Sequence, residues 1–366
     1  MNPTVSVIIL NYNGIKSLGK TLLGDCLSSV LESDYDDFEL IFYDNGSVDK
    51  SLEFVKEKFG QNSRLKIIVG SKNSGFAQGN NLAFAHTRGN YIVLLNNDAV
   101  VEPNWIKELI KVMEADLTIG IAQSKIVSFD RIRIQTAGDL VDPSLGVYLM
   151  GLEVIDNGQY DKMSEITFAC GAALITRRSL IKKIGLFDPD YFWYHDDVDF
   201  GWRARLIGLK IVYVPSSVVY HKGSGTSVHA FKGGQELLFF LMSSFGLFVK
   251  NYEWKSILKH GTKFCVRLST DLFGLTLKGD LKTPLKFATW ALGSFRDNWA
   301  KRLIVQKQIR KVKDDEVLKV FLSSYLLVLR FEKFFNKLVG GKIRKDFDKL
   351  TDQALYDYYK HHSFEL

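Results

Sequence analysis

Short apolar runs alternate with amphipathic stretches along the N-terminal part of the chain. The apolar runs are rich in Val, Ile, Phe and Tyr, have the length of buried strands, and cover residues 5–10, 38–43, 65–69 and 91–95. Helical spacing of apolar side chains follows at residues 17–31 and 51–59. Strands that are apolar on both faces need helices on both sides. The pattern therefore predicts a doubly wound α/β domain with a parallel sheet in the N-terminal half.

Four polar clusters follow these strands, at the edge where open α/β sheets bind ligands. They are Asn11-Tyr12-Asn13-Gly14, Asp44-Asn45-Gly46-Ser47, residues 71–76, and Asn96-Asn97-Asp98. Each cluster alone fits ordinary turn and helix-capping residues, but four at one edge favour a binding site. The sequence has no G-x-G-x-x-G after the first strand and no P-loop motif, so neither a nicotinamide dehydrogenase nor a P-loop enzyme is favoured.

A second chemically dense region begins near residue 168. It holds a small-residue turn at residues 170–172, an aromatic stretch at 191–194, three aspartates at 196, 197 and 199, and a histidine at 221. Three adjacent carboxylates repel one another unless a cation, an arginine or a substrate relieves the repulsion. In a structural interpretation, they form an acidic helix N-terminus paired with Arg203 and Arg205. The aromatic residues before them suit a sugar ring and favour a catalytic role.

Charge and composition separate the C-terminal third from the rest of the 366-residue chain. Residues 250–366 hold 24 Lys and Arg against 13 Asp and Glu, a net charge of +11. No nucleic-acid-binding motif accompanies them, so nucleic acid is not expected as a partner. The three cysteines are odd in number and far apart, and the N-terminus lacks the features of a secretory signal. We therefore expect a cytoplasmic protein.

Beyond residue 230 the pattern is helical. The apolar run at residues 237–249 is shorter than the roughly 20 residues that span a bilayer. Residues 287–295 and 317–331 are amphipathic, with lysines and arginines close by. Two interpretations stay open at this point. These helices pack against the catalytic domain, or they lie in the interface of an anionic membrane.

Taken in order, the motifs resemble those of the family 2 inverting glycosyltransferases with the GT-A fold, in the branch that includes rhamnosyltransferases. The resemblance covers about residues 4–228 and rests on VSVIILNYNG, YDNGSVD, NSGFAQGNN, LLNNDAVV, GAALITRRSL, LFDPDYFWYHDDVDFGWR and VYHKGSGTS. It implies an α/β GT-A domain over residues 1–230, with a doubly wound mixed sheet flanked by helices. Residues 231–366 would form a helical, basic extension that associates with membrane or packs on the domain.

The resemblance also implies a donor and a metal. Asp98 matches the last carboxylate of the family's D-x-D motif and His221 a second ligand, so Mg²⁺ or Mn²⁺ is the expected cofactor. Asn96 departs from the motif, where many relatives carry Asp, which removes one negative charge. Asp44 matches the carboxylate that recognises a pyrimidine, which implies a UDP- or dTDP-sugar, with rhamnose the first candidate. The implied donor-binding residues are Asn11, Tyr12, Asn13, Asp44, Asn73, Gly75, Phe76, Asn80, Asn96 and Asn97.

For catalysis, the resemblance makes Asp197 the general base that deprotonates an acceptor hydroxyl. Asp199 is expected to stabilise its helix instead. The acceptor, a glycan or lipid-linked glycan, would contact Cys170, Gly171, Trp193 and Asp196. The expected place of work is the cytosolic face of a membrane, with the protein bound peripherally. A non-catalytic module that binds glycans or nucleotide sugars is the alternative, and the presence of Asp98, Asp197 and His221 disfavours it.

Overall fold

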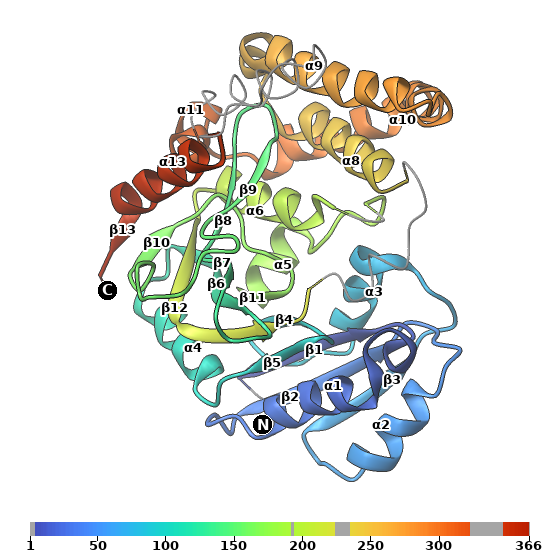
Figure 1. Cartoon of the computed structure of the whole chain (residues 1–366), viewed down its shortest axis with the longest axis vertical. Helices are drawn as coiled ribbons and strands as arrows, with labels where there is room; N and C mark the ends of the chain where they lie inside the picture. The colour runs from blue at the N-terminus through green and yellow to red at the C-terminus, as the bar shows by residue number, and fades with distance from the viewer. Residues whose placement is uncertain (1–3, 192–193, 224–234, 323–346, 366) are drawn as a thin grey trace.

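A mixed β-sheet runs through the structure, with helices on both faces and a layer of helices beyond one end (Figure 1). The structure is a computed structural model that describes residues 4–191, 194–223, 235–322 and 347–365. The main sheet has the order β13-β10-β12-β6-β11-β4-β1-β2-β3, with β5 beside β12 and β7 beside β6. Its strands are β1 (Val5–Asn11), β2 (Phe38–Asp44), β3 (Leu65–Val69), β4 (Tyr91–Asn96), β5 (Ala99–Val101), β6 (Ile119–Ser128), β7 (Ile134–Thr136), β10 (Met163–Glu165), β11 (Ala173–Arg177), β12 (Lys210–His221) and β13 (Ser363–Phe364).

Helices cover the two faces of the sheet in separate groups. Side chains of α1 (Gly14–Leu31), α2 (Ser51–Phe59) and α4 (Trp105–Ala115) join one core cluster. Those of α3 (Gly75–Phe84), α5 (Arg178–Ile184) and α6 (Asp196–Leu206) join the other. Strand β1 places Val7 and Ile9 in the first cluster and Ile8 in the second. This explains the unbroken apolar run of the strand and confirms the predicted doubly wound domain.

Strands β4, β1 and β2 are parallel neighbours, so their carboxyl ends meet at one edge. Asn11 is paired in register with Asp44, and Leu10 with Asn96. Each of the four strands predicted from the apolar runs is present within one residue of its expected limits. The polar clusters that end β1, β2 and β4 therefore lie side by side.

Two antiparallel pairings bring later parts of the chain to the same edge. Strand β11 lies between β4 and β6, with Ala173 paired to Leu95, so the small-residue turn at 170–172 adjoins the end of β4. Strand β12 pairs with β5, with His221 opposite Ala99. His221 is thereby brought next to Asp98, more than a hundred residues away in sequence. A separate two-stranded ribbon, β8 (Asp139–Val141) and β9 (Val147–Leu149), lies over α6.

The C-terminal region forms helices that pack on α6 and then return to the sheet. Helices α8 (Gln235–Asn251), α9 (Trp254–Leu277) and α10 (Lys282–Ile304) lie together at the top of Figure 1. Trp202 of α6 packs edge-on against Tyr252 and Phe321, with ring centroids 4.7 and 4.8 Å away. The remaining elements are η1 (Val305–Ile309), α11 (Asp314–Val317), η2 (Leu318–Val320), α13 (Phe347–His362) and β13, which pairs with β10.

This packing ties residues on both sides of position 230 to one core. The sequence-based division at that position stays a prediction, as does a membrane role for the extension. In the part of the chain that the structure describes, no helix combines the length and the apolar character needed to cross a bilayer. All three cysteines, Cys26, Cys170 and Cys265, are free thiols.

Candidate active site

The side chain of Asn11 connects three strand ends. Its amide nitrogen donates to Asp44 Oδ1 at 3.0 Å, and its carbonyl oxygen accepts from Asn97 Nδ2 at 2.9 Å. The backbone N–H of Ser47 donates to Asp44 Oδ2 at 3.0 Å. Gly14 allows this close packing, since a Cβ there would lie 2.2 Å from Asn11 Oδ1. Asn11, Asp44 and Asn97 are buried and form one rigid network across β2, β1 and β4.

The loops beside this network are joined by asparagines. Asn13 takes a left-handed conformation (φ 50°) and accepts a hydrogen bond from the Val48 N–H at 2.8 Å. Asn45, which the sequence did not single out, donates to Asn73 Oδ1 at 3.1 Å and accepts from Ser74 Oγ at 2.9 Å. Its only sequence signal was its place in a turn-like cluster. Asn45 therefore fixes the loop at residues 71–76 against the end of β2.

The remaining predicted donor residues line the same group of loops. Gly75 has φ 81°, a conformation suited to glycine, and starts α3. The buried Asn80 donates to the Phe76 carbonyl at 3.0 Å, so it supports the first turn of α3. The ring of Phe76 is partly buried and lies 5.8 Å from that of Phe187. Tyr12 is partly buried directly after β1.

Asp98 and His221 form a close pair of metal-type donor atoms. Asp98 Oδ1 lies 3.0 Å from His221 Nε2, and Asn96 Nδ2 lies 3.2 Å from the same nitrogen. Gln135 of β7, which sequence reasoning missed, donates through Nε2 to the His221 carbonyl at 2.7 Å. Its Oε1 therefore faces His221 Nδ1, at 2.8 Å, and accepts the Nδ1–H. A hydrogen bond from Nε2 to Asp98 requires a proton on Nε2, whereas a ring that keeps only the Nδ1 proton has its lone pair on Nε2, available to a cation held together with Asp98.

This pair of donors fits a divalent cation. Two cis ligands about 2.1 Å from one octahedral cation lie about 3 Å apart, which matches the Oδ1–Nε2 separation. Burial raises the pKa of Asp98, but the charge and hydrogen bond of His221 outweigh it and hold the pKa below its usual value. Among the described residues there is no cluster of three or more His, Cys, Asp or Glu side chains suited to a metal. Phosphate oxygens and water would therefore complete the shell.

Asp197 is joined to the metal-type pair through two backbone contacts. The Gly171 N–H donates to Asp197 Oδ2 at 3.2 Å, and the Asn96 N–H donates to the carbonyl of the next residue, Ala172, at 3.0 Å. The glycine at position 171 also leaves room for the Phe76 ring, because a Cβ there would lie 3.1 Å from a carbon of that ring. Sequence segments at 76, 96–98, 171 and 197 thus meet at one place.

Asp196 and Asp197 are adjacent, but their surroundings give them different pKa values. Burial raises the pKa of Asp197 to about 6, although hydrogen bonds from the Gly171 and Val198 N–H groups act against it. Burial, and then the charge of Asp197, raise the pKa of Asp196 well above its ordinary value. Asp196 Oδ2 is buried without a hydrogen-bond partner among the described residues. Near neutral pH, Asp197 is the ionised member of the pair.

Two residues behind this pair were not found from sequence. Gln123 of β6 accepts the Cys170 N–H at 2.8 Å and holds the small-residue turn. Asp139 of β8 is buried and accepts from Thr136 Oγ1 at 2.5 Å, and burial raises its pKa to about 8. Asp139 lies in a segment of short strands without clear periodicity, and Gln123 lies inside the ten-residue strand β6, so neither stood out in the sequence.

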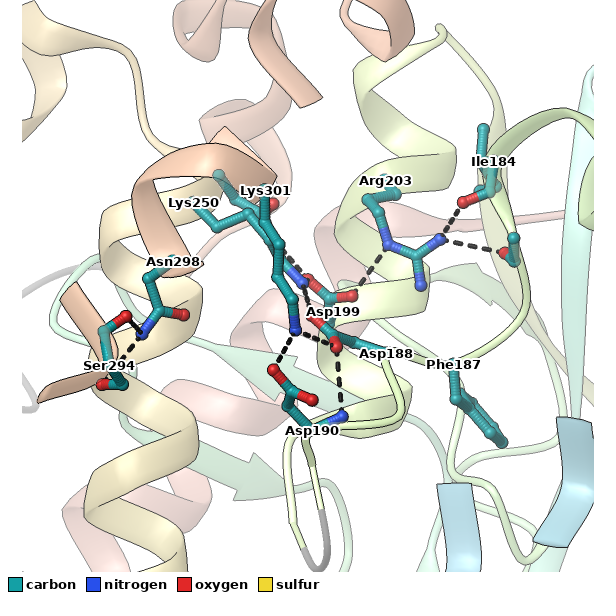
Figure 2. A network of polar contacts seen from close by, with 12 residues as sticks. Ile184, Phe187, Asp188, Asp190, Asp199, Arg203, Lys250, Ser294, Asn298 and Lys301 are labelled. Carbon is teal, nitrogen blue, oxygen red and sulfur yellow. Dashed lines mark hydrogen bonds and ion pairs between the residues drawn. The ribbon is translucent and has the colours of Figure 1, made fainter. Parts of the chain in front are cut away.

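The third aspartate of the cluster has a different environment. Asp199 pairs with Arg203, Nε to Oδ2 at 2.8 Å, and with Lys250 of α8, Nζ to Oδ1 at 2.9 Å (Figure 2). The alternative, structural interpretation of the cluster paired it with both Arg203 and Arg205. Arg203 does pair with Asp199, but the Arg205 guanidinium reaches Glu165 of β10 at 2.7 Å instead. Asp196 and Asp197 therefore have no arginine partner in the described part of the chain.

The segment before α6 is attached to the C-terminal helices. Asp188 accepts from Lys250 at 2.7 Å and also pairs with Lys301 of α10, which reaches Asp190 at 2.6 Å (Figure 2). His195, in a left-handed conformation (φ 61°), precedes Asp196, and burial lowers its pKa to about 3. Trp193, predicted to contact the acceptor, lies outside the described residues.

Comparison with known proteins agrees with this arrangement. Residues 6–185 match the model of the family described as glycosyl transferase family 2. The uncharacterized protein y4gI of Sinorhizobium fredii is 26% identical over 243 residues, which are 62% of this chain and 25% of that protein. The chain thus spans only a quarter of that relative. Glycosyltransferase GlyG of Streptococcus pneumoniae is 27% identical over 233 residues, with 62% of this chain and 73% of GlyG covered.

The fold also matches a solved structure. The crystal structure of GalNAc-T7 with UDP, GalNAc and Mn²⁺ aligns with a TM-score of 0.59 at 17% identity, covering 81% of this chain and 58% of that chain. At this identity the likeness concerns the fold, which is that of the GT-A glycosyltransferases. The family match over residues 6–185, the related GlyG sequence and this architecture together support a family 2 glycosyltransferase.

Proposed function

We propose that the protein is an inverting glycosyltransferase that moves a sugar from a UDP- or dTDP-sugar to a hydroxyl of a glycan or lipid-linked glycan. One observation carries the proposal. The Asp98–His221 donor pair and the Asp197 carboxylate are linked through Asn96–Ala172 and Gly171–Asp197 contacts of 3.0 and 3.2 Å. A leaving diphosphate and an attacking hydroxyl need such groups within one pocket.

The donor proposal rests on the polar network at the strand ends. Asp44 is held rigidly by Asn11 and Ser47, and a carboxylate oxygen with a free lone pair can accept the N3–H of uracil or thymine. Asn97 and Asn96 supply amides for the ribose, and Tyr12 and Phe76 offer aromatic faces beside the loops. GalNAc-T7 was solved with UDP and Mn²⁺, which is consistent with a uridine donor here. Rhamnose is the first sugar to test.

The metal proposal assigns Asp98 and His221 as the protein ligands. A divalent cation at this place would neutralise the negative charge that develops on the departing diphosphate. Asn96, the neutral residue at the first position of the motif, keeps the amide contact to His221. Gln135 holds the His221 ring so that Nε2 faces Asp98.

The chemistry proposed for the chain itself is proton transfer to Asp197. The acceptor oxygen forms a bond to the anomeric carbon while the carbon–phosphate oxygen bond breaks on the opposite face, and the hydroxyl proton moves to Asp197. A pKa of about 6 leaves Asp197 ionised at neutral pH yet basic enough to take this proton. Gly171 and Val198 keep the carboxylate oriented, and Cys170, Gly171, Trp193 and Asp196 would contact the acceptor.

We also propose that the enzyme works at the cytosolic face of a membrane, as a peripheral protein. The support is the net charge of +11 on residues 250–366, which favours an anionic surface. A lipid-linked acceptor would be presented there.

A donor screen tests the function. The protein is incubated with UDP-, dTDP- and GDP-sugars, including the rhamnose donor, and nucleoside diphosphate release is measured. Release from a UDP- or dTDP-sugar is expected, and NMR of the transferred sugar should show an inverted anomeric configuration. Release from a GDP-sugar alone would contradict the pyrimidine site, and retention of configuration would exclude Asp197 as the base of a single displacement.

A further inference from the structure

Helices α9 and α10 expose an unusual number of large apolar side chains. On α9 they recur at helical spacing, and α10 continues the pattern after the connecting turn. We name this surface the α9–α10 face. Its apolar members are between 42% and 82% exposed, and they are Trp254, Leu258, Val266, Phe273, Leu277, Leu281, Leu285, Leu292, Phe295, Leu303 and Ile304.

The opposite sides of both helices are packed, so the exposure belongs to one side of each helix. Phe264 of α9 stacks on Phe248 of α8, with ring centroids 4.2 Å apart. Phe287 of α10 lies edge-on to Phe245 of α8 at 6.2 Å. Arg302 of α10 is buried and donates to the Tyr252 carbonyl at 2.6 Å. The helices are thus anchored on α8, at the end of the molecule opposite α1 and α2 (Figure 1).

The exposed charges among these apolar residues are predominantly positive. Within residues 254–304 the exposed basic side chains are Lys255, Lys259, Lys278, Lys282, Lys286 and Arg296, whereas Asp297 is the exposed acidic one. Long basic side chains can extend from an apolar surface toward anionic groups. Apolar side chains with flanking lysines and arginines are characteristic of helices that lie in the plane of an anionic membrane surface.

We propose that the α9–α10 face binds the surface of an anionic lipid bilayer, with the two helices parallel to the membrane plane. The apolar side chains enter the boundary of the acyl chains, and the six basic residues contact anionic headgroups. The inference rests on the proposed function only in its purpose, which is to hold the enzyme beside a lipid-linked acceptor. Charge complementarity favours a bilayer as the occupant over a second copy, whose identical face would carry the same positive charge.

Vesicle binding of the full chain tests this assignment. Vesicles of phosphatidylglycerol and phosphatidylcholine should sediment the protein at low ionic strength, and pure phosphatidylcholine should do so at least ten-fold less well. Leu258→Ser/Leu285→Ser/Leu292→Ser should weaken binding at least five-fold, since these are highly exposed residues of the face. Each basic residue near an anionic surface strengthens binding roughly five-fold, so Lys255→Gln/Lys259→Gln/Lys282→Gln/Lys286→Gln should cost at least ten-fold.

Matched variants elsewhere on the surface provide the controls. Leu117→Ser/Leu152→Ser/Ile155→Ser and Lys56→Gln/Lys107→Gln/Lys111→Gln/Lys182→Gln change exposed residues outside the face and should bind vesicles as the native protein does. UDP affinity, measured by calorimetry, should be the same in all variants. Failure of the native protein to bind UDP would count against the proposed function and leave the vesicle result intact.

Three results would overturn the assignment. They are no sedimentation with anionic vesicles, equal loss of binding in the face and control variants, and a dimer in light scattering that the serine triple variant dissociates. The last would assign the face to a second copy of the chain.

Discussion

Lys250 and Asp199 form a buried ion pair between a C-terminal helix and the helix that carries Asp197. Nζ lies 2.9 Å from Oδ1, and the two side chains are 3% and 0% exposed. The same ammonium contacts Asp188 at 2.7 Å, in the segment that leads to Asp196 (Figure 2). The C-terminal region therefore supports helix α6, which carries Asp197.

Lys250→Met should destabilise the protein by about 3–5 kcal/mol, because it leaves Asp188 and Asp199 buried without their shared cation. Urea unfolding of both proteins measures the difference. Lys319→Met is the matched control, since Lys319 pairs with Glu316 on the surface and exposed pairs contribute about 0–1 kcal/mol. If Lys250→Met lowers the free energy of unfolding by less than about 1 kcal/mol, the neighbouring cations Lys301 and Arg203 are enough to stabilise the two buried aspartates.

The acid limb of the stability profile should depend on the same cluster. Burial raises the pKa of Asp188, but the charges of Lys250 and Lys301 outweigh it and hold the pKa well below its usual value. Burial likewise raises the pKa of Asp199, and the charges of Lys250 and Arg203 outweigh it, so this pKa is also lowered. Such groups stabilise the fold above their unfolded pKa of about 4 and lose that effect as the pH falls toward the lowered folded value. Unfolding followed from pH 6 to pH 2 should show a steep loss in the native protein and a shallower one in Lys250→Met. Parallel curves would contradict this.

Asp197→Asn should reduce the transfer rate at least about 10²-fold while UDP affinity stays within about two-fold, because the amide keeps the shape but cannot accept a proton. In the native enzyme, activity should fall as the pH drops through about 6, where Asp197 becomes protonated. The Asn variant should lack this limb. The transfer rate per folded molecule and the UDP affinity from calorimetry test whether Asp197 is the base. Asp199→Asn is the comparison, because it disturbs the ion pairs with Lys250 and Arg203 instead.

Asp197→Asn should lower the transfer rate, but we expect it to leave the stability of the fold unchanged or raise it at high pH. A carboxyl whose pKa is raised in the fold stabilises the protein below its unfolded pKa, and this effect is lost as the pH rises through the folded value of about 6. Asp197 therefore opposes folding at pH 8, and Asp197→Asn should melt at an equal or higher temperature than the native protein there. At pH 5 the gain should shrink. A variant that melts lower at pH 8 would show that the carboxylate hydrogen bonds to Gly171 and Val198 dominate.

The parts of the fold that follow local rules were predictable from sequence. Residues 5–10 are apolar on both faces because both sides of β1 are covered, and the polar residues that follow mark the strand end. Parallel register then aligns Asn11 with Asp44 without further information. Only the motif resemblance could lead us to expect that Asp98 and His221 lie close together. Their proximity arises from the antiparallel pairing of β12 with β5.

What failed or was missed depends on long-range packing. Gln135 lies in a three-residue strand whose partner, β6, is known only from the fold. The structural interpretation of the acidic cluster paired Arg205 with its acidic neighbours, but its side chain projects from α6 toward β10 and meets Glu165. Lys250 and Lys301 reach Asp188 from helices 62 and 113 residues later. No spacing rule connects such residues, because the contact exists only after the helices have packed.

The last prediction concerns Gln135 and the metal. If Asp98 and His221 hold a divalent cation, EDTA should abolish transfer, and Mn²⁺ or Mg²⁺ should restore it. His221→Ala should weaken Mn²⁺ binding, measured by electron paramagnetic resonance in the presence of UDP. Gln135→Met removes the hydrogen bond to the imidazole Nδ1 and the one that fixes the Gln135 side chain on the His221 carbonyl, and loss of such a partner typically costs 10–100-fold in metal affinity.

Gln135→Glu distinguishes the effect of orienting the His221 ring from the effect of filling the space beside it. A glutamate can still accept the His221 Nδ1–H, so it should retain more Mn²⁺ affinity than Gln135→Met, although it loses the donor to the His221 carbonyl. UDP affinity without metal should be unaffected by either change, since Gln135 has no contact with the Asn11–Asp44 network. Full transfer activity after metal removal would exclude the Asp98–His221 site. Equal Mn²⁺ affinity in the native protein and Gln135→Met would leave the histidine oriented by Asp98 and Asn96 alone.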